Sequence, residues 1–351
     1  MANIASYHQA LREGKTTVVQ TVKDFLARIE AKKHLNAYLA VYTEEALASA
    51  AKVDAKIAAG TGGKLAGVVV GIKDNICYAD HPVHGASKIL EGFESLYSAT
   101  AVEQLLAEDA IIIGRLNCDE FAMGSSNENS AFGNVLNPID EARVPGGSSG
   151  GSAVAVAAGL CHVSLGSETG GSVRQPASFC GIVGVKPTYG RVSRHGLLAF
   201  ASSFDQIGPF ANNVEDAALV LEVISGKDSF DSTSSSTTVP TYDLSSTKKK
   251  RFAYLKDCLE NEALDATIKT RFLEVVEKMK ADGHTVEAVD FPMLEHLIPT
   301  YYILTTAEAS SNLSRYDGMR YGYRSEKATD LESTYKLSRS EGFGDEVKRR
   351  I

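Results

Sequence analysis

The sequence lacks the features that mark a secreted, membrane-spanning or metal-binding protein. Its five cysteines are widely spaced and include no C-x-x-C pair, which argues against a zinc site or a disulfide framework and predicts reduced thiols. The polar N-terminus, residues 1–15, has no apolar signal core. The longest apolar run, residues 153–161 with one glycine, is too short to span a bilayer. We therefore expect a soluble, cytoplasmic protein without a metal site.

Positive charge is also scarce. The 36 lysines and arginines are outnumbered by 44 acidic residues, which gives a formal net charge of -8 and an isoelectric point near 5.6. Nothing in this balance attracts a nucleic acid or an anionic membrane directly. If an RNA takes part in the function, we expect a partner protein to do most of the binding. The length of 351 residues, with 44% apolar residues, allows two domains or one large α/β domain.

Hydrophobic periodicity predicts an α/β core. Apolar residues recur at helical spacing from Val18 to Ile29, behind a Thr16 or Thr17 cap. Short apolar runs predict buried strands, and alanine-rich or periodic segments predict helices. The strands are expected at 68–72, 110–114, 252–255 and 285–289, and further helices at 43–59, 101–108 and 264–280. This alternation indicates a sheet with helices on both faces.

We treat the chain as a single domain with four successive segments. These are N-terminal helices in residues 1–62, a glycine-rich catalytic core in 63–225, a surface loop in 226–250 and a later α/β part in 251–351. The loop is predicted from its serine, threonine and lysine content. Residues 346–351 resemble the opening of a helix with no cap after it, so we expect the C-terminal part to be missing.

Two serine-bearing glycine runs, residues 145–152 and 169–176, carry most of the functional information. They flank apolar sequence, so they do not behave as flexible linkers. Glycines beside buried segments indicate backbone brought close to a small molecule. The N-H groups of the second run can stabilise an oxyanion beside the hydroxyl of Ser172, although an ordinary tight turn is the alternative. The N-H groups in question belong to Thr169, Gly170, Gly171 and Ser172.

A serine nucleophile needs a base, and the eight histidines form no triad pattern. Lys73 ends an apolar strand, where burial can lower its pKa enough to make it a base. Taken alone, Lys73 is better explained as a strand-end lysine that reaches solvent or pairs with Asp74. Ser148 can stand between Ser172 and a neutral Lys73 as a proton relay, since Ser-Lys pairs are a known variant of nucleophile and base.

Two other motif interpretations fail on their context. Residues 147–151 fit G-x-S-x-G with Ser149 as nucleophile, but the loop-like residues 137–141 stand where a strand is required. Residues 146–152 half-match a phosphate-binding loop, but Ser152 occupies the position of its lysine.

Three motifs together resemble the amidase signature family. They are G-I-K-D-N with Lys73, G-G-S-S-G-G-S with Ser148, and T-G-G-S-V-R-Q-P with Ser172, the two serines being 24 residues apart. The resemblance covers nearly the whole chain. It implies a mixed sheet, Ser172 as nucleophile, Ser148 in a cis peptide as relay, and Lys73 as base.

Further stretches resemble the members of this family that hydrolyse glutamine within tRNA-dependent amidotransferases. These stretches are residues 119–126, 186–194, 200–206, 306–313 and 320–322. The resemblance implies a glutamyl-Ser172 intermediate. It also implies that Gly124, Ser125, Tyr301 and Arg350 hold the glutamine, with Arg350 pairing its carboxylate.

The same resemblance implies partners. Ammonia would pass to a partner subunit, where ATP-activated Glu-tRNA(Gln) is converted to Gln-tRNA(Gln), in a complex with amidotransferase subunits B and C. No cofactor is expected on this chain, and ATP and Mg²⁺ are expected at the partner. Members of the family are longer, and their later part holds an acidic residue for the glutamine amino group. A stand-alone amide hydrolase and a truncated, non-catalytic scaffold are the alternatives.

Overall fold

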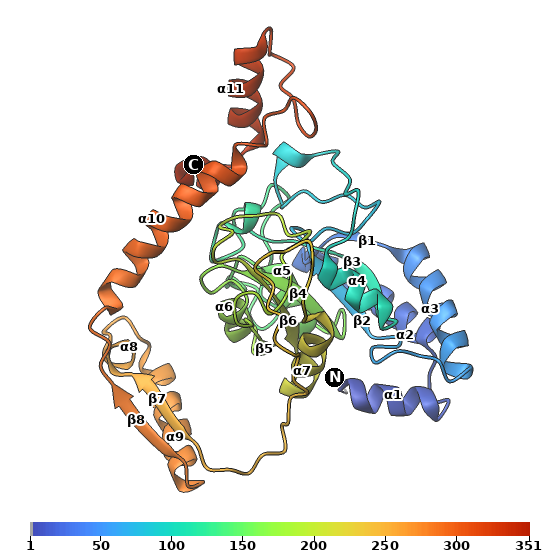
Figure 1. Cartoon of the computed structure of the whole chain (residues 1–351), viewed down its shortest axis with the longest axis vertical. Helices are drawn as coiled ribbons and strands as arrows, with labels where there is room; N and C mark the ends of the chain where they lie inside the picture. The colour runs from blue at the N-terminus through green and yellow to red at the C-terminus, as the bar shows by residue number, and fades with distance from the viewer. Residues whose placement is uncertain (1–2) are drawn as a thin grey trace. The chain divides into compact units, whose positions relative to one another are not determined.

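The computed structural model describes residues 3–351, which form two compact units (Figure 1). The first unit contains the residues up to 242 together with 306–351, and the second contains residues 243–305. The boundary falls inside helix α10, Leu294–Leu313. Within residues 3–351, no helix has both the length and the apolar character needed to cross a membrane.

The first unit is built on a six-stranded sheet in the order β1-β3-β2-β4-β6-β5. The two pairings of β2, with β3 and with β4, are parallel, and the other three pairings are antiparallel. The sheet is therefore mixed, as the family resemblance implied. The strands are β1 Tyr38–Val41, β2 Val69–Lys73, β3 Ile111–Leu116, β4 Val163–Glu168, β5 Val183–Gly184 and β6 Gln206–Ala211.

Helices cover both faces of this sheet, which confirms the predicted layer arrangement (Figure 1). One apolar core packs α2, α3, α5 and α6 against one face, and a second packs α1, α4 and α7 against the other. In β3, Ile111 and Ile113 belong to the first core and Ile112 to the second, because successive strand side chains point to opposite faces. The helices of this unit are α1 Ile4–Arg12, α2 Val18–Ala31, α3 Thr43–Ala58, α4 Thr100–Ala107, α5 Gly150–Ala157, α6 Arg174–Phe179, α7 Val214–Ile224, α11 Leu331–Gly342 and α12 Asp345–Arg350.

Local chemistry explains why α2 begins where the sequence predicts. Thr17 is its N-cap, and the Thr17 hydroxyl accepts a hydrogen bond from the Gln20 N-H at 3.0 Å. The carboxylate of Asp54 in α3 accepts the N-H groups of Val18 and Val19 at 2.7 and 3.0 Å. A side chain from the neighbouring helix therefore satisfies two more of the N-H groups that a helix start leaves free.

The second unit is a small strand-helix-strand motif. Strands β7 Arg251–Leu255 and β8 Thr285–Val289 pair in parallel, and α9 Ala266–Ala281 connects them after the short α8 Lys256–Glu260. The predicted strand at 285–289 and the strand and helix before it are confirmed. The division of the chain into four sequence segments stays a prediction.

The segment between α7 and β7 is only partly a solvated loop. Residues 226–250 form neither helix nor strand, but Asp228, Asp231 and Ser234 are buried. Asp228 accepts a hydrogen bond from the hydroxyl of Thr100, and Asp231 pairs with Arg194 at 2.9 Å. The first part of this segment is therefore anchored to the first unit by buried carboxylates.

Candidate active site

Lys73 is the last residue of β2, a central strand of the sheet, and its side chain is fully buried. Its Nζ atom lies 2.7 Å from Oγ of Ser148, 2.9 Å from Oγ of Ser149 and 3.0 Å from Oγ of Ser167. Asp74 pairs instead with Arg115 at 2.7 Å. The interpretation of Lys73 as a solvent-exposed or Asp74-paired lysine is therefore wrong.

The three hydroxyl groups around Lys73 are held in different ways. The Ser149 hydroxyl donates to the carbonyl of Ser167 at 3.0 Å, so it faces Lys73 as an acceptor. Oγ of Ser167 also accepts the side-chain amide of Asn75 at 2.8 Å. Ser148 is the nearest of the three to Nζ. An ammonium group has three N-H donors, and three hydroxyl oxygens surround it here.

Burial sets the protonation of Lys73. Because water is excluded, the pKa of Lys73 falls from its ordinary 10.5 to about 8, although nearby groups that include Asp119 and Asp205 raise it by a smaller amount. A substantial share of the lysine is therefore neutral in mildly alkaline solution. A neutral amine beside a hydroxyl can accept that hydroxyl's proton.

The two serine runs meet in space. The N-H of Ser149 donates to the carbonyl oxygen of Ser172 at 3.2 Å, and the Gly147–Ser148 peptide bond is cis. Helix α5 begins at Gly150, immediately after the first run. The structure therefore brings together Lys73, Ser148 and the backbone of Ser172, which the sequence separates by up to 99 residues (172 − 73).

The turn that carries Ser172 presents free backbone donors. Within residues 3–351, no hydrogen-bond acceptor engages the N-H groups of Thr169, Gly170, Gly171 and Ser172. Gly171 has a φ of +130°, which side chains rarely allow, and this accounts for a glycine there. The two following N-H groups, of Val173 and Arg174, both donate to the Glu168 carboxylate at 3.0 Å. The free donors are therefore confined to the residues just before and at Ser172.

The loop that carries Gly124 and Ser125 packs against the Ser148 run. Gln175 joins the two, because its Oε1 accepts the N-H of Gly147 at 3.0 Å and its Nε2 donates to the carbonyl of Ser125 at 2.8 Å. The Asp119 carboxylate fills the space beside both glycines: a Cβ would lie 2.1 Å from its Oδ2 at Gly147 and 2.3 Å from its Cγ at Gly124. Gly124 and Ser125 therefore lie beside the serine run, and their role in substrate binding stays a prediction.

Arg350 and Tyr301 lie in different units. Arg350 ends α12, with its guanidinium 5.9 Å from the centre of the Phe200 ring and 2.8 Å from Glu346. Tyr301 lies on α10 within the second unit, where its ring packs edge-on against Tyr302.

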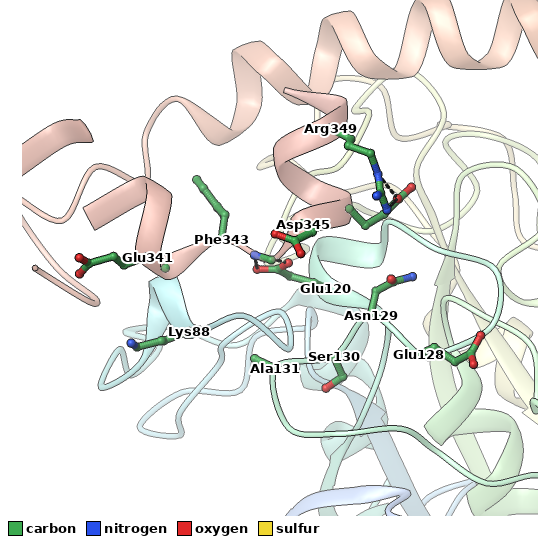
Figure 2. Close-up of a pocket in the computed structure, with 13 residues that line it drawn as sticks. Lys88, Glu120, Glu128, Asn129, Ser130, Ala131, Glu341, Phe343, Asp345 and Arg349 are labelled. Carbon is green, nitrogen blue, oxygen red and sulfur yellow. Dashed lines mark hydrogen bonds and ion pairs between the residues drawn. The ribbon is translucent and has the colours of Figure 1, made fainter. Parts of the chain in front are cut away.

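Helix α12, which carries Arg350, is held over a cleft of about 540 Å³ (Figure 2). Glu120 accepts the N-H of Gly344 at 2.9 Å and a hydrogen bond from the Ser87 hydroxyl. Burial raises the pKa of Glu120 from 4.5 to about 7, against the lowering effect of these contacts. Figure 2 shows Glu120 beneath the start of α12, close to Asp345. A buried carboxyl group therefore helps to anchor the start of the helix that ends at Arg350.

The profile of the amidase family matches residues 20–351. This chain belongs to the amidase family. The amidase is 55% identical to the A subunit of glutamyl-tRNA(Gln) amidotransferase from Chlorobium luteolum, over 95% of this chain and 70% of that protein. The protein of the same name from Chlorobaculum tepidum is 53% identical over 97% of this chain and 72% of its own length.

Solved structures of an amidotransferase A subunit and of a peptide amidase are also similar to this chain. The A subunit of glutamyl-tRNA(Gln) amidotransferase from Thermotoga maritima superimposes on this amidase with a TM-score of 0.75 and 36% identity, over 93% of this chain and 72% of that one. The peptide amidase of Stenotrophomonas maltophilia superimposes with a TM-score of 0.84 and 28% identity, over 99% and 74%.

Several residues of the amidase site escaped the sequence analysis. Ser149 and Ser167 contact Lys73, Asn75 donates to Ser167, and Gln175 and Asp119 hold the neighbouring loop. Gln175 lies inside the motif that identified Ser172, so the motif itself was the available signal. Asn75, Ser149 and Asp119 also lie inside the motifs and stretches that carry the resemblance, whereas Ser167 lies outside them and contacts Lys73 across 94 residues.

Proposed function

We propose that this amidase is the glutamine-hydrolysing subunit of a tRNA-dependent amidotransferase that converts Glu-tRNA(Gln) to Gln-tRNA(Gln). The observation that carries the proposal is the buried contact of Lys73 with Ser148, in a serine run bonded to the backbone of Ser172. The substrate assignment rests on relatives more than 50% identical that carry the name of the A subunit of this enzyme.

The chemistry is acyl transfer. Oγ of Ser172 attacks the side-chain carboxamide carbon of glutamine, its proton passes to Ser148, and the Ser148 proton passes to neutral Lys73. The negative oxygen of the tetrahedral intermediate binds to the free N-H groups before and at Ser172, each worth about 3 kcal/mol in comparable sites. The carbon–nitrogen bond then breaks, and the proton returns through Ser148 to the leaving ammonia.

Water completes the cycle. It attacks the glutamyl ester of Ser172 with the same lysine as base, and glutamate leaves. Backbone groups of Gly124 and Ser125 line the substrate, with Arg350 pairing the glutamine carboxylate.

Partner subunits carry out the remaining steps of the reaction, in which the ammonia is used. Subunits B and C complete a heterotrimer in the cytoplasm, and the ammonia moves to the subunit that holds ATP, Mg²⁺ and Glu-tRNA(Gln). No cofactor is needed on this chain. The net charge of -8 supports this division, since a chain with this balance does not attract tRNA directly.

The test is glutamine-dependent conversion of Glu-tRNA(Gln) by the complex, with Ser172→Ala beside the unchanged protein. We expect the variant to lose conversion with glutamine and to recover it with free ammonium, because only the ammonia donor is damaged. Ser178→Ala, an exposed serine of α6, is the matched control and should behave as the unchanged protein. Loss with both nitrogen donors would contradict the proposal.

A second candidate is a stand-alone amide hydrolase. The resemblance to a peptide amidase over 99% of this chain favours it. Hydrolysis of small amides without any response to subunits B and C would move the conclusion to this activity. A protein that binds both subunits and hydrolyses neither glutamine nor small amides would be the non-catalytic scaffold.

A further inference from the structure

We propose that Asp205 is a positioning residue for the oxyanion-binding turn, acting through the hydroxyl of Thr169. The inference rests on the proposed function, because it concerns the turn that carries Ser172.

Asp205 has a separate partner for each carboxylate oxygen. It is 4% exposed and immediately precedes β6, which pairs with β4, the strand that leads into the turn. Its Oδ1 accepts the hydroxyl of Thr169 at 2.5 Å. Its Oδ2 accepts the N-H groups of Phe200 and Ala201 at 2.9 and 3.0 Å. One oxygen therefore holds the turn, and the other holds the 200–201 loop.

Two backbone bonds also hold the turn, from the Gln175 N-H to the Gly171 carbonyl at 2.8 Å and from the Ser149 N-H to the Ser172 carbonyl at 3.2 Å, but its side chains contribute little. Gly170 and Gly171 have no side chains, and the nearest atom to a Cβ built on Gly171 is 4.0 Å away. At the far end of the turn, Glu168 accepts the N-H groups of Val173 and Arg174. Two buried carboxylates thus fix the turn, one at each end, and the four free N-H groups of residues 169–172 lie between these contacts. Oxyanion donors act only when they are held where charge develops, so the Thr169 contact affects the reaction rate.

Asp205 also acts electrostatically on Lys73, and this effect must be separated from its positioning of the turn. Its negative charge raises the pKa of Lys73. Burial in turn raises the pKa of Asp205 itself to about 7, against the hydrogen bonds that it accepts. At pH 9 both groups lie above their pKa values of about 8 and about 7, so a shift in the pKa of Lys73 changes its neutral fraction little, and a double-mutant cycle isolates the positioning effect.

The experiment is a double-mutant cycle on the complex at pH 9, with kcat and KM for glutamine as readouts. Thr169→Val removes the hydroxyl, and we expect kcat to fall about 10-fold with KM within twofold, because the turn loses one holding bond and keeps its N-H groups. Thr169→Ser keeps the hydroxyl and should stay within about threefold of the unchanged protein. Asp205→Asn can still accept both loop N-H groups, so it is expected to fold.

The cycle separates positioning from a purely structural role. Asp205→Asn should lower kcat in the unchanged and Thr169→Ser backgrounds and add little in the Thr169→Val background. An equal cost of Asp205→Asn in all three backgrounds, or an unchanged kcat in Thr169→Val, would overturn the inference. Melting temperatures measured on the same variants identify any loss that comes from unfolding.

A substrate-independent readout keeps the inference distinct from the proposed function. A fluorophosphonate reacts with an activated serine and develops charge on its phosphoryl oxygen, so its labelling rate reports the same turn. If the unchanged complex does not hydrolyse glutamine, the proposed function fails. The labelling cycle then still decides the inference, with slower labelling in Thr169→Val supporting it and equal labelling contradicting it.

Discussion

Ser149 contacts Lys73 almost as closely as Ser148 does, with Nζ to Oγ distances of 2.9 and 2.7 Å. The two neighbouring hydroxyls nevertheless differ in their other partners. The Ser149 hydroxyl donates its proton to the carbonyl of Ser167, whereas within residues 3–351 no acceptor takes the proton of the Ser148 hydroxyl. The distance to Lys73 therefore does not distinguish a serine that relays a proton from a serine that only supports the lysine by a hydrogen bond. The acceptor of the hydroxyl proton does distinguish them.

Alanine substitution of these two serines should give unequal losses. Ser148→Ala removes the proton relay and should lower kcat for glutamine by about 10³-fold, within the range for general acid-base groups. Ser149→Ala removes a hydrogen bond to Lys73 and two with the Ser167 backbone but no proton relay, and should cost about 10-fold. Steady-state glutamine hydrolysis measures both. Equal losses would indicate that the two hydroxyls share one role.

The rate should depend on pH through Lys73. Since the base must be neutral and the pKa of Lys73 is lowered by burial to about 8, kcat/KM should rise as pH increases through about 8 and then level off. Asp205→Asn removes a negative charge that raises this pKa, so its midpoint should move to lower pH, whereas Thr169→Val should leave the midpoint unchanged. A profile from pH 6 to 10 that stays flat would exclude Lys73 as the base.

Glu120 should make stability fall between mildly acidic and neutral pH. Burial raises its pKa from 4.5 to about 7, so the folded state holds the proton more tightly than the unfolded state. The resulting stabilisation is complete below pH 4.5 and is lost as pH rises through 7, a change on the order of 3 kcal/mol.

Glu120→Gln should remove this contribution, so the melting temperature of the variant should depend less on pH between 4.5 and 7. Glu128→Gln, at an exposed residue of the same cleft, is the matched control and should keep the slope of the unchanged protein (Figure 2). Identical slopes for Glu120→Gln and the unchanged protein would show that Glu120 titrates as an ordinary carboxyl group.

Two adjacent arginines offer a matched test of glutamine recognition. Both pair with Glu346, but the side chain of Arg350 is 9% exposed and that of Arg349 is 70% exposed. Arg350→Ala should raise KM for glutamine about 10- to 100-fold, because a charge-assisted contact to the carboxylate is lost. Arg349→Ala should leave KM within twofold. Similar values of KM for both variants would remove Arg350 from the substrate site.

Local signals explain how much of the fold could be predicted from the sequence. The Thr17 cap, the apolar runs of β2 and β3, and the strand at 285–289 all depend on residues within a few positions of one another. The order of the strands in the sheet does not. It depends on which apolar faces pack together, and the sequence analysis gave a mixed sheet only through the family resemblance.

The residues of the site also divide into those that local motifs identify and those whose roles depend on contacts with distant parts of the chain. Lys73, Ser148 and Ser172 stand in compact motifs, so they could be identified one motif at a time. Ser167 contacts Lys73 across 94 residues, and Asp205 contacts Thr169 across 36, so neither role is visible locally. Asp228 was assigned to a solvated loop for the same reason, because its partner Thr100 lies 128 residues away.

The Asp119 carboxylate restricts how this site can change by mutation. Because it occupies the space beside both Gly124 and Gly147, any side chain added at either glycine collides with it. Shortening Asp119 first would release the N-H groups of Asn127 and Asn129, which its oxygens accept at 3.0 and 3.1 Å. Changing these positions one substitution at a time therefore always produces a variant that has either a steric clash or unpaired backbone N-H groups. In a library of point variants these three positions should behave as one unit, tolerant only of the residues that they already hold.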